Sequence, residues 1–417
     1  MTKEQKYLLY RKMKAFRDSL AYVIMRVLPV KNNRIAVCTF EGKGGFGCNP
    51  RYVVEELHRR NPKYEFVWIV NDETKEFPDY VKAVKNTLWR RTYYLSTSRV
   101  WIDNYRKPYG TKKRKKQLYI QTWHGTICFK ALGKWRGDGF SKIAYLVSKN
   151  DSDMIDYVVI DSEWCREAYP NGLVYDGEYL KAGSPRCDIM INRREQQSKI
   201  IRKKYGVNDN AKIVMFAPTF REIGQKDKRG VYIGETTLDF EKLLDTLAEK
   251  FGGEWILFMR LHPQLAEQMN TLPLGKVRDK VVDVSKADDM CEIMAAVDVM
   301  ITDYSSAAID ASYIYMPVFL YADDIEQYVG NRGGMFWNYS LDSNEPITTN
   351  KEMTPGIDAV LPFSMAQNND ELRNNILSFD RTEYENKVKE MHKAVGLLND
   401  GHASERVADL IEEKVVL

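Results

Sequence analysis

Short hydrophobic segments that alternate with helical segments constrain the fold of this chain more than any other feature. Residues 34–40, 66–70 and 100–103 are rich in β-branched and aromatic side chains, which favour strands. The second half repeats the pattern, with strands predicted at residues 212–217, 255–259, 297–301 and 317–321. Strands that alternate with helices predict an α/β fold with a mainly parallel, doubly wound sheet in each half.

The length of the chain supports this division into two halves. A chain of 417 residues is too long for one ordinary core and favours about two or three domains. Glycine and proline break the chain at residues 183–185, so we expect a boundary near residue 190. The predicted parts are an N-terminal helix (1–32), two Rossmann-like domains (33–190 and 191–380), and C-terminal helices packing back across both domains (381–417).

Composition excludes several classes of protein. No segment approaches the ~20 apolar residues that a membrane-spanning helix needs, and the first residues lack the apolar core of a signal peptide. The six cysteines are scattered without metal-ligand spacing, which is typical of reduced thiols in a cytoplasmic protein. We therefore predict no metal site and no required cofactor. The sequence leaves dependence on a free divalent metal, and the oligomeric state, undefined.

Two basic segments indicate contact with an anionic surface. Apolar residues between positions 7 and 28 recur at three- and four-residue spacing, and basic residues that include Lys12 and Arg17 supply the polar side. This helix either lies on an anionic membrane surface or packs on the protein's own core. The second segment is a cationic run that could meet a membrane or polyanion: Lys112, Lys113, Arg114, Lys115 and Lys116. No nucleic-acid recognition module accompanies it.

One histidine follows a predicted strand at the edge where open α/β folds bind ligands. Residues 118–120 form the end of a short buried strand, and the polar segment that contains His124 and Gly125 comes directly after it. A single histidine in such a place is more often structural than catalytic. The unperturbed pKa of histidine, near 6.5, nevertheless suits it to accept a hydroxyl proton.

A second group of polar residues follows strands in the other half. The strand at 255–259 ends at Arg260 and His262, and the strand at 297–301 leads through Asp303 to Ser305 and Ser306. Either serine could cap the next helix, whose free N–H groups favour an anion. With an arginine and a histidine beside it, this group predicts a site for a phosphate leaving group. Together the two halves, facing each other across a cleft, indicate transfer from a nucleotide-activated donor to a hydroxyl.

A glycine-rich loop follows the first strand. Glu41 and Gly42 begin this loop, and Asn49 lies where the next helix starts. The arrangement of strand, glycine loop and helix also suits a dinucleotide fingerprint, but the GxGxxG spacing is absent. We therefore expect a close backbone approach to an acceptor or a phosphate.

These motifs resemble those of the CDP-glycerol glycerophosphotransferase family of teichoic acid synthesis over residues 33–412. The most distinctive is Gln121-Thr122-Trp123-His124-Gly125-Thr126. Others, in the same order as in the family, are Glu41-Gly42 with Cys48-Asn49-Pro50, Gly183-Ser184-Pro185-Arg186-Cys187-Asp188, Ala217-Pro218-Thr219-Phe220-Arg221, Arg260-Leu261-His262-Pro263, Ile301-Thr302-Asp303-Tyr304-Ser305-Ser306, residues 321–328, and Arg332-Gly333.

The resemblance implies a GT-B architecture and an inverting transfer at the cytoplasmic face of the bacterial cell membrane. Glycerol phosphate would move from CDP-glycerol to a hydroxyl of a lipid-linked or glycan acceptor, releasing CMP. It also implies that His124 is the base and that His262 steadies the donor phosphates. The remaining candidates are Arg260, Thr219, Arg221, Asp303, Ser305 and Ser306 on the donor side, and Glu41, Gly42, Asn49, Trp123, Gly125 and Thr126 on the acceptor side.

One departure from the family pattern bears on the acceptor. After Thr126 the family continues Pro-Leu-Lys, whereas residues 127–130 read Ile-Cys-Phe-Lys here and are one residue longer. Three alternatives stay open: a CDP-ribitol-dependent transferase, a GT-B glycosyltransferase that uses a nucleotide sugar, and a non-catalytic protein that binds the membrane surface.

Overall fold

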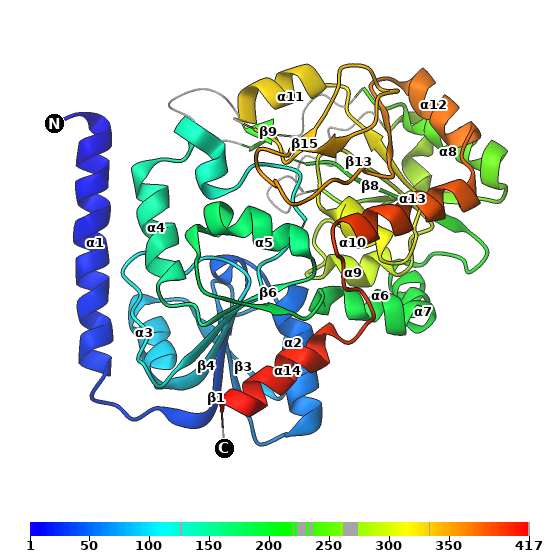
Figure 1. The fold of residues 1–417 in the computed structure, drawn as a ribbon. Coiled ribbons are helices and arrows are strands. Elements are labelled where there is room, and N and C mark those ends of the chain that lie inside the picture. The colour runs from blue at the N-terminus through cyan, green and yellow to red at the C-terminus, as the bar shows by residue number, and fades with distance from the viewer. Residues whose placement is uncertain are drawn as a thin grey trace. The chain divides into compact units, whose positions relative to one another are not determined.

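The computed structural model describes residues 1–125, 127–219, 221–222, 231–232, 237–261, 274–332 and 334–415, without the side chains of residues 221–222, 231–232 and 331–332. It divides into two compact units (Figure 1). Unit 1 comprises Met1–Thr126, Ala131–Asp188 and Leu397–Leu417, and unit 2 comprises Ile127–Lys130 and Ile189–Gly396.

Unit 1 is built on a seven-stranded sheet in which every pairing is parallel. The strand order is β3-β2-β1-β4-β5-β6-β7. The strands are β1 (Lys31–Cys38), β2 (Glu65–Val70), β3 (Val81–Lys85), β4 (Ser98–Asp103), β5 (Leu118–Gln121), β6 (Tyr157–Ile160) and β7 (Glu178–Lys181). Buried β-branched and aromatic residues dominate them, because a parallel sheet is covered on both faces.

Helices cover both faces of this sheet. Alternate residues of β1 face opposite sides, so Ile35 joins the core under α2 and α14, whereas Ala36 joins the core under α1 and α3. Helices α2 and α14 lie side by side (Figure 1). The helical segments are α1 (Lys3–Met25), α2 (Cys48–Arg60), α3 (Leu88–Thr97), α4 (Lys142–Ser152), α5 (Glu163–Tyr169), α14 (Ala403–Lys414), and the short turns η1 (Phe40–Gly42), η2 (Gly133–Gly139), η3 (Pro170–Val174) and η4 (Pro185–Cys187).

Helix α1 packs within unit 1 through small residues and through Tyr22. Ala15, Ala21 and Tyr22 are buried, and a Cβ added to Gly110 would lie only 2.3 Å from the Ala15 carbonyl oxygen. The Ser19 hydroxyl donates to the Gly110 carbonyl oxygen at 2.9 Å. Apart from Tyr22, most of the large apolar residues of the helix lie on other faces, so its packing face differs from its most hydrophobic face.

Unit 2 is built on a six-stranded parallel sheet of order β12-β11-β8-β13-β14-β17. Helices α8 and α12 lie together and bury their apolar sides on one face of it (Figure 1). The strands are β8 (Lys212–Ala217), β11 (Trp255–Met259), β12 (Val281–Asp283), β13 (Val299–Thr302), β14 (Val318–Tyr321) and β17 (Ser364–Ala366), with the antiparallel pairs β9 (Arg221–Glu222) and β10 (Val231–Tyr232), and β15 (Trp337–Asn338) and β16 (Thr348–Thr349). The helices are α6 (Asp188–Asn192), α7 (Arg194–Tyr205), α8 (Phe240–Phe251), α9 (Met290–Met294), α10 (Ala307–Ser312), α11 (Ile325–Arg332), α12 (Asn369–Leu377), α13 (Arg381–Ala394) and the turn η6 (Gly275–Lys280).

The units divide the chain differently from the sequence prediction at two places. Residues 381–417, predicted as one tail, split between the units: α13 belongs to unit 2 and α14 to unit 1. The segment Ile127–Lys130, the one that departs from the family pattern, belongs to unit 2, where the Phe129 carbonyl oxygen accepts from the Phe336 backbone N–H at 2.9 Å.

Each sheet has one point where the strand order reverses direction, and ligands of open α/β folds bind there. In unit 1 it lies between β1 and β4, and in unit 2 between β8 and β13. The predicted site residues follow these strands or their neighbours.

Candidate active site

The candidate base, His124, lies beside the loop that follows β4. Strands β4 and β5 are paired with Asp103 opposite Gln121, so their carboxyl ends open at the same edge. The His124 Nδ1 lies 2.6 Å from the Asn104 carbonyl oxygen. A carbonyl oxygen can only accept, so Nδ1 carries the hydrogen and Nε2 is the unprotonated nitrogen. Among the described residues, Nε2 has no hydrogen-bond partner, and the ring is half-buried.

Two side chains of the His124 motif hold its loop to the neighbouring strand. The Gln121 side chain accepts from the Trp123 backbone N–H at 3.0 Å and donates to the Tyr105 carbonyl oxygen at 3.1 Å. The backbone N–H and the hydroxyl of Thr122 both donate to the Asp103 carbonyl oxygen, at 2.7 and 3.0 Å. These bonds therefore hold the loop to the neighbouring strand.

Residues from distant parts of the chain complete the support. The Asn49 amide donates to the carbonyl oxygens of Thr122 and Trp123 at 3.1 and 3.0 Å, and its own oxygen accepts from the Arg186 backbone N–H at 3.0 Å. The Arg186 guanidinium donates to the His124 carbonyl oxygen. Trp123 has a φ of +50°, a left-handed conformation that costs on the order of 1 kcal/mol for a residue with a Cβ. These bonds stabilise that conformation.

The surroundings of the imidazole keep it neutral. The rings of Phe40, Tyr105 and Trp123 lie with centroids 5.4, 5.5 and 4.5 Å from that of His124. Burial lowers the pKa of His124 to about 4; the bond to Asn104 raises this pKa, and the positive charges of Arg186 and Arg106 lower it further. At neutral pH the ring is therefore deprotonated and can accept a proton.

The turn after β1 lies against the same loop. The Phe40 backbone N–H donates to the Asn104 side-chain oxygen at 2.8 Å. Gly42 has a φ of +86°, and a Cβ there would lie 2.8 Å from the Asn71 side-chain oxygen. In the structure the backbone at Gly42 thus lies close to Asn71, and the predicted approach to an acceptor or a phosphate stays a prediction. The Glu41 side chain is exposed.

On the donor side, Asp303 is a supporting residue in the structure. It is 3% exposed. Its two carboxylate oxygens accept from the Thr219 backbone N–H at 3.0 and 3.1 Å, from the Thr219 hydroxyl at 3.0 Å and from the Tyr304 backbone N–H at 2.6 Å. These bonds join the segments after β8 and β13, so Asp303 fixes the position of the half-buried Thr219.

The predicted serine cap takes a different form. Ser306 is the N-cap of α10 but makes no side-chain cap bond, whereas the Ser305 hydroxyl accepts from the Ala307 backbone N–H at 3.3 Å. Helix α10 has only six residues, so its dipole gives less support to an anion than the sequence suggested. Both serines are half-buried.

Arg260 follows β11, the strand next to β8, and its guanidinium donates to the Val284 carbonyl oxygen at 2.5 Å. The structure thus gathers Arg260, Thr219 and Ser305 at the carboxyl edge of three neighbouring strands. His262, Thr126 and the side chain of Arg221 lie outside the described residues.

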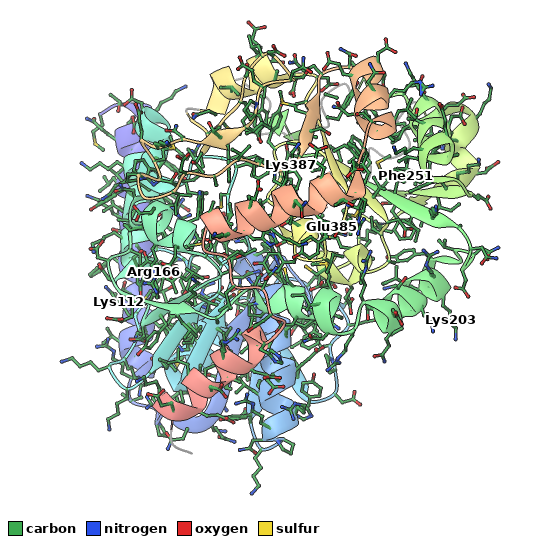
Figure 2. The ribbon with its side chains drawn as sticks, turned by 45° about the vertical axis from the view of Figure 1, so that its right-hand side comes forward. Lys112, Arg166, Lys203, Phe251, Glu385 and Lys387 are labelled. Carbon is green, nitrogen blue, oxygen red and sulfur yellow. The ribbon has the colours of Figure 1, made fainter. Side chains whose placement is uncertain are left out.

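The cationic run divides into supporting and exposed side chains. Lys113 forms an ion pair with Asp156 at 2.7 Å, and the Arg114 guanidinium donates to the carbonyl oxygens of Met25 and Leu28 at 2.7 and 2.8 Å, which closes the end of α1. Lys112 (Figure 2), Lys115 and Lys116 are exposed, as are Lys12 and Arg17 on α1.

Sequence reasoning missed Asn104 as a site residue and gave Arg186 no role. Asn104 carried the same signal as His124, since it directly follows a buried strand at the same sheet edge. Arg186 carried no comparable signal, because its contact with His124 joins residues that lie 62 positions apart. In the part of the chain that the structure describes, no cluster of three metal-ligating side chains occurs, and no helix is long and apolar enough to cross a membrane.

Comparisons with known proteins give the family and the fold. The model of the family described as CDP-glycerol:poly(glycerophosphate) glycerophosphotransferase matches residues 20–413. The teichoic acid poly(glycerol phosphate) polymerase of Staphylococcus epidermidis is 27% identical over 97% of this chain and 56% of its own length. The teichoic acid poly(ribitol-phosphate) polymerase of Bacillus spizizenii is 27% identical over 96% of this chain and 60% of its own length. The chain thus spans less than two thirds of either relative.

A solved structure of the wall teichoic acid polymerase TagF aligns with a TM-score of 0.78 at 24% identity, covering 99% of this chain and 98% of that one. That likeness, together with the two parallel sheets, confirms the predicted α/β fold of GT-B type with two Rossmann-like domains. The family match spans most of the chain and agrees with the resemblance carried by the motifs. The chain therefore belongs to the CDP-glycerol:poly(glycerophosphate) glycerophosphotransferase family of transferases.

Proposed function

We propose that this protein transfers glycerol phosphate from CDP-glycerol to a hydroxyl of a lipid-linked or polysaccharide acceptor and releases CMP. Its family and the glycerol phosphate polymerase among its relatives support this choice of donor. The observation that carries the proposal is the state of His124. Its imidazole is neutral at physiological pH, bonded through Nδ1 to the Asn104 carbonyl oxygen, and presents an unprotonated Nε2.

The proposed reaction needs a single proton acceptor. The Nε2 of His124 takes the proton of the acceptor hydroxyl, and that oxygen forms a bond to the phosphorus that carries glycerol. The bond from this phosphorus to the bridging oxygen breaks, and CMP leaves with the electron pair. General-base catalysis of this kind contributes typically ~10²- to 10⁴-fold.

Unit 2 would bind the donor. Arg260, the Thr219 hydroxyl, Ser305 and Ser306 follow neighbouring strand ends and suit the phosphate oxygens of CDP-glycerol. Asp303 would act indirectly, by holding Thr219. His262 and Arg221 keep their predicted roles on the phosphates.

The test is CMP release from CDP-glycerol with a lipid-linked acceptor mixture, by wild type and by His124→Ala. The matched control is His402→Ala, because His402 is an exposed residue beside α14 that pairs with Glu405. We expect His124→Ala to lose at least about 100-fold in kcat and the control to keep its activity. Equal turnover by wild type and His124→Ala would refute the role of His124.

A CDP-ribitol donor is the nearest alternative, since the ribitol phosphate and glycerol phosphate polymerases are each 27% identical to this chain. Parallel reactions with CDP-ribitol, followed by CMP release, and with nucleotide sugars, followed by release of the nucleotide leaving group, separate the donors. CMP release from CDP-glycerol alone supports the proposal. Turnover of any donor excludes a protein that only binds membranes.

We further propose that α1 attaches the protein to the anionic cytoplasmic face of the membrane. Its outward apolar side chains recur with helical spacing, and each is 47% exposed or more: Leu9, Met13, Phe16, Leu20, Val23 and Ile24 on the helix, and Val27 in the turn after it. Exposed basic residues flank this stripe, among them Lys12. An apolar stripe with basic borders suits a helix lying in an anionic membrane surface. The basic side chains of Lys112, Lys115 and Lys116 would add attraction of roughly 1 kcal/mol each near such a surface.

Co-sedimentation with phosphatidylglycerol vesicles tests this attachment. We expect Phe16→Glu with Leu20→Glu to abolish binding, because both side chains are exposed and substitution leaves the packing face of α1 intact. The control is Ile200→Glu, since Ile200 is 50% exposed on α7 in unit 2. Unchanged binding of the double variant would remove α1 from the contact, and equal binding to neutral vesicles would remove the electrostatic part.

A further inference from the structure

A buried group of charged residues lies directly behind the loop that holds His124. Asp103 and Lys107, the first and last residues of that loop, form an ion pair, and their side chains are 2% and 3% exposed. A second carboxylate, that of Asp151, accepts from the Lys107 backbone N–H at 3.1 Å and from the Tyr119 hydroxyl at 3.0 Å. Buried charges of this kind are costly unless they are paired, so they call for an explanation.

The charge states of the group favour a paired arrangement. Burial raises the pKa of Asp103 to about 6, which the charge of Lys107 and its hydrogen bond partly oppose. Burial lowers the pKa of Lys107, but the charge and hydrogen bond of Asp103, with contributions from Cys38 and Tyr22, together raise it above its ordinary value, so the ammonium keeps its proton. The Lys107 ammonium also lies over the rings of Trp101 and Tyr119, at 5.7 and 5.6 Å from their centroids.

The ion pair closes the loop on itself. Because the first and last residues are joined, the three residues between them have little freedom. Their own contacts confirm this: the Asn104 side-chain oxygen accepts from the Phe40 N–H at 2.8 Å, and the Tyr105 carbonyl oxygen accepts from Gln121 at 3.1 Å. The Asn104 carbonyl oxygen, which bonds His124, is therefore fixed in place.

We propose that the closed loop of residues 103–107, held by the Asp103–Lys107 pair and by Asp151, is a positioning device that sets the tautomer and orientation of His124 through the Asn104 carbonyl oxygen. This inference rests on the proposed function, in which His124 is the base. A backbone carbonyl bonds Nδ1–H without adding a negative charge, so it selects the tautomer while leaving the imidazole neutral.

Asp103, Lys107 and Asp151 are thus positioning residues, and none of them need touch a substrate. The loop is best tested by a substitution that opens it without leaving either Asp103 or Lys107 as a buried charge whose partner is missing. The double variant Asp103→Asn with Lys107→Met removes both charges and keeps similar volumes. Its control, Lys149→Met with Asp153→Asn, removes an exposed Lys–Asp pair of the same four-residue spacing on α4.

The first measurement is the tautomer of His124, by ¹⁵N NMR of protein labelled in its five histidines, with the His124 signals assigned by their loss in His124→Ala. Wild type and control should show a protonated Nδ1 and an unprotonated Nε2. The double variant should show a mixture of tautomers. An unchanged Nδ1–H tautomer in the double variant overturns the inference.

The second measurement is the kinetics of CMP release. We expect kcat of the double variant to fall about 10- to 100-fold, with the KM for donor unchanged because the donor contacts lie in unit 2. The conservative variant Lys107→Arg should recover part of the loss. A double variant that keeps the kcat of wild type overturns the inference. The tautomer measurement needs no turnover, so inactive wild-type protein would refute the proposed function while leaving the NMR test of this loop decisive.

Discussion

Two aspartates occupy matching places in the two units and are balanced in different ways. Asp103 ends β4 and Asp303 follows β13, each at the switch point of its sheet, and they are 2% and 3% exposed. Asp103 is met by a full positive charge on Lys107. Asp303 is met by the N–H and O–H groups of Thr219 and by the Tyr304 N–H.

The difference shows that the same residue in the same place supports two kinds of loop. In unit 1 the charged pair closes a loop of five residues, whose carbonyl oxygen then holds a titratable ring. In unit 2 the carboxylate joins two neighbouring strand ends and leaves a hydroxyl and two serines half-buried near the sheet edge. Removing one partner from the first arrangement should therefore cost more than altering the second.

The largest effect on stability is expected from Lys107→Ala. The substitution leaves the Asp103 carboxylate buried without its cation, which costs about 3–5 kcal/mol in the free energy of unfolding. Urea unfolding followed by circular dichroism measures this loss. The control Lys149→Ala breaks an exposed pair and should change the free energy by less than about 0.5 kcal/mol. Equal losses for both variants would show that the buried charge is not the cause.

Asp303→Asn should have a smaller effect. An amide offers one acceptor oxygen where the carboxylate offers two, so at least one of the donors from Thr219 and Tyr304 loses its partner, at a cost of about 1–3 kcal/mol. Because Thr219 would shift, we also expect a higher KM for CDP-glycerol with the acceptor KM unchanged. Loss of stability equal to that of Lys107→Ala would erase the contrast between the two aspartates.

The pH profile of kcat sharpens the unit 1 side of the comparison. Burial, together with the charges of Arg186 and Arg106, lowers the pKa of His124 to about 4, so the base form persists as pH falls and is lost only through that value. At pH 5.5 about 97% of the ring would remain deprotonated, against about 10% for an ordinary histidine. Circular dichroism at each pH confirms that the protein stays folded. Protonation of Asp103, whose pKa burial raises to about 6, would also open the loop, so the profile is compared with that of the Asp103→Asn, Lys107→Met double variant. An acidic limb near pH 6.5 that persists in the double variant would contradict the buried, neutral base.

Much of this arrangement could be predicted from the sequence, and the rest could not for identifiable reasons. A strand can be recognised from its local sequence pattern. The polar residues that follow the strands, including His124 and Arg260, were therefore correctly located at sheet edges. The support of His124 by Asn49 and Arg186 depends on contacts over 62 to 74 residues, which no local pattern encodes. Asn49 is bonded to the loop across 73 and 74 positions, and Arg186 across 62. The sequence therefore did not indicate that Asn49 supports the loop of His124.

The packing face of helix α1 is a second feature that could not be predicted from the sequence. The sequence showed an apolar stripe and left open whether it meets the protein or a membrane. The structure packs the helix through small residues such as Ala15 and Ala21 and leaves Phe16 68% exposed. Small residues allow a close backbone approach, as at Gly110, and the periodicity of large apolar residues gives no sign of it.

The smallest effect on stability is expected from substitution of the serines before α10. These variants distinguish a serine that stabilises the loop from one that binds the donor. Ser305→Ala removes the bond from the Ala307 N–H and should cost about 0.5–1 kcal/mol in the free energy of unfolding. Ser306 makes no side-chain cap bond, so Ser306→Ala should leave stability unchanged. Each serine variant is thus the control for the other. A rise in the KM for CDP-glycerol in Ser306→Ala, without loss of stability, would report direct contact with the donor. If both variants keep the donor KM of wild type, the loop after β13 serves only to hold the strand ends, and donor binding passes to Arg260 and Thr219.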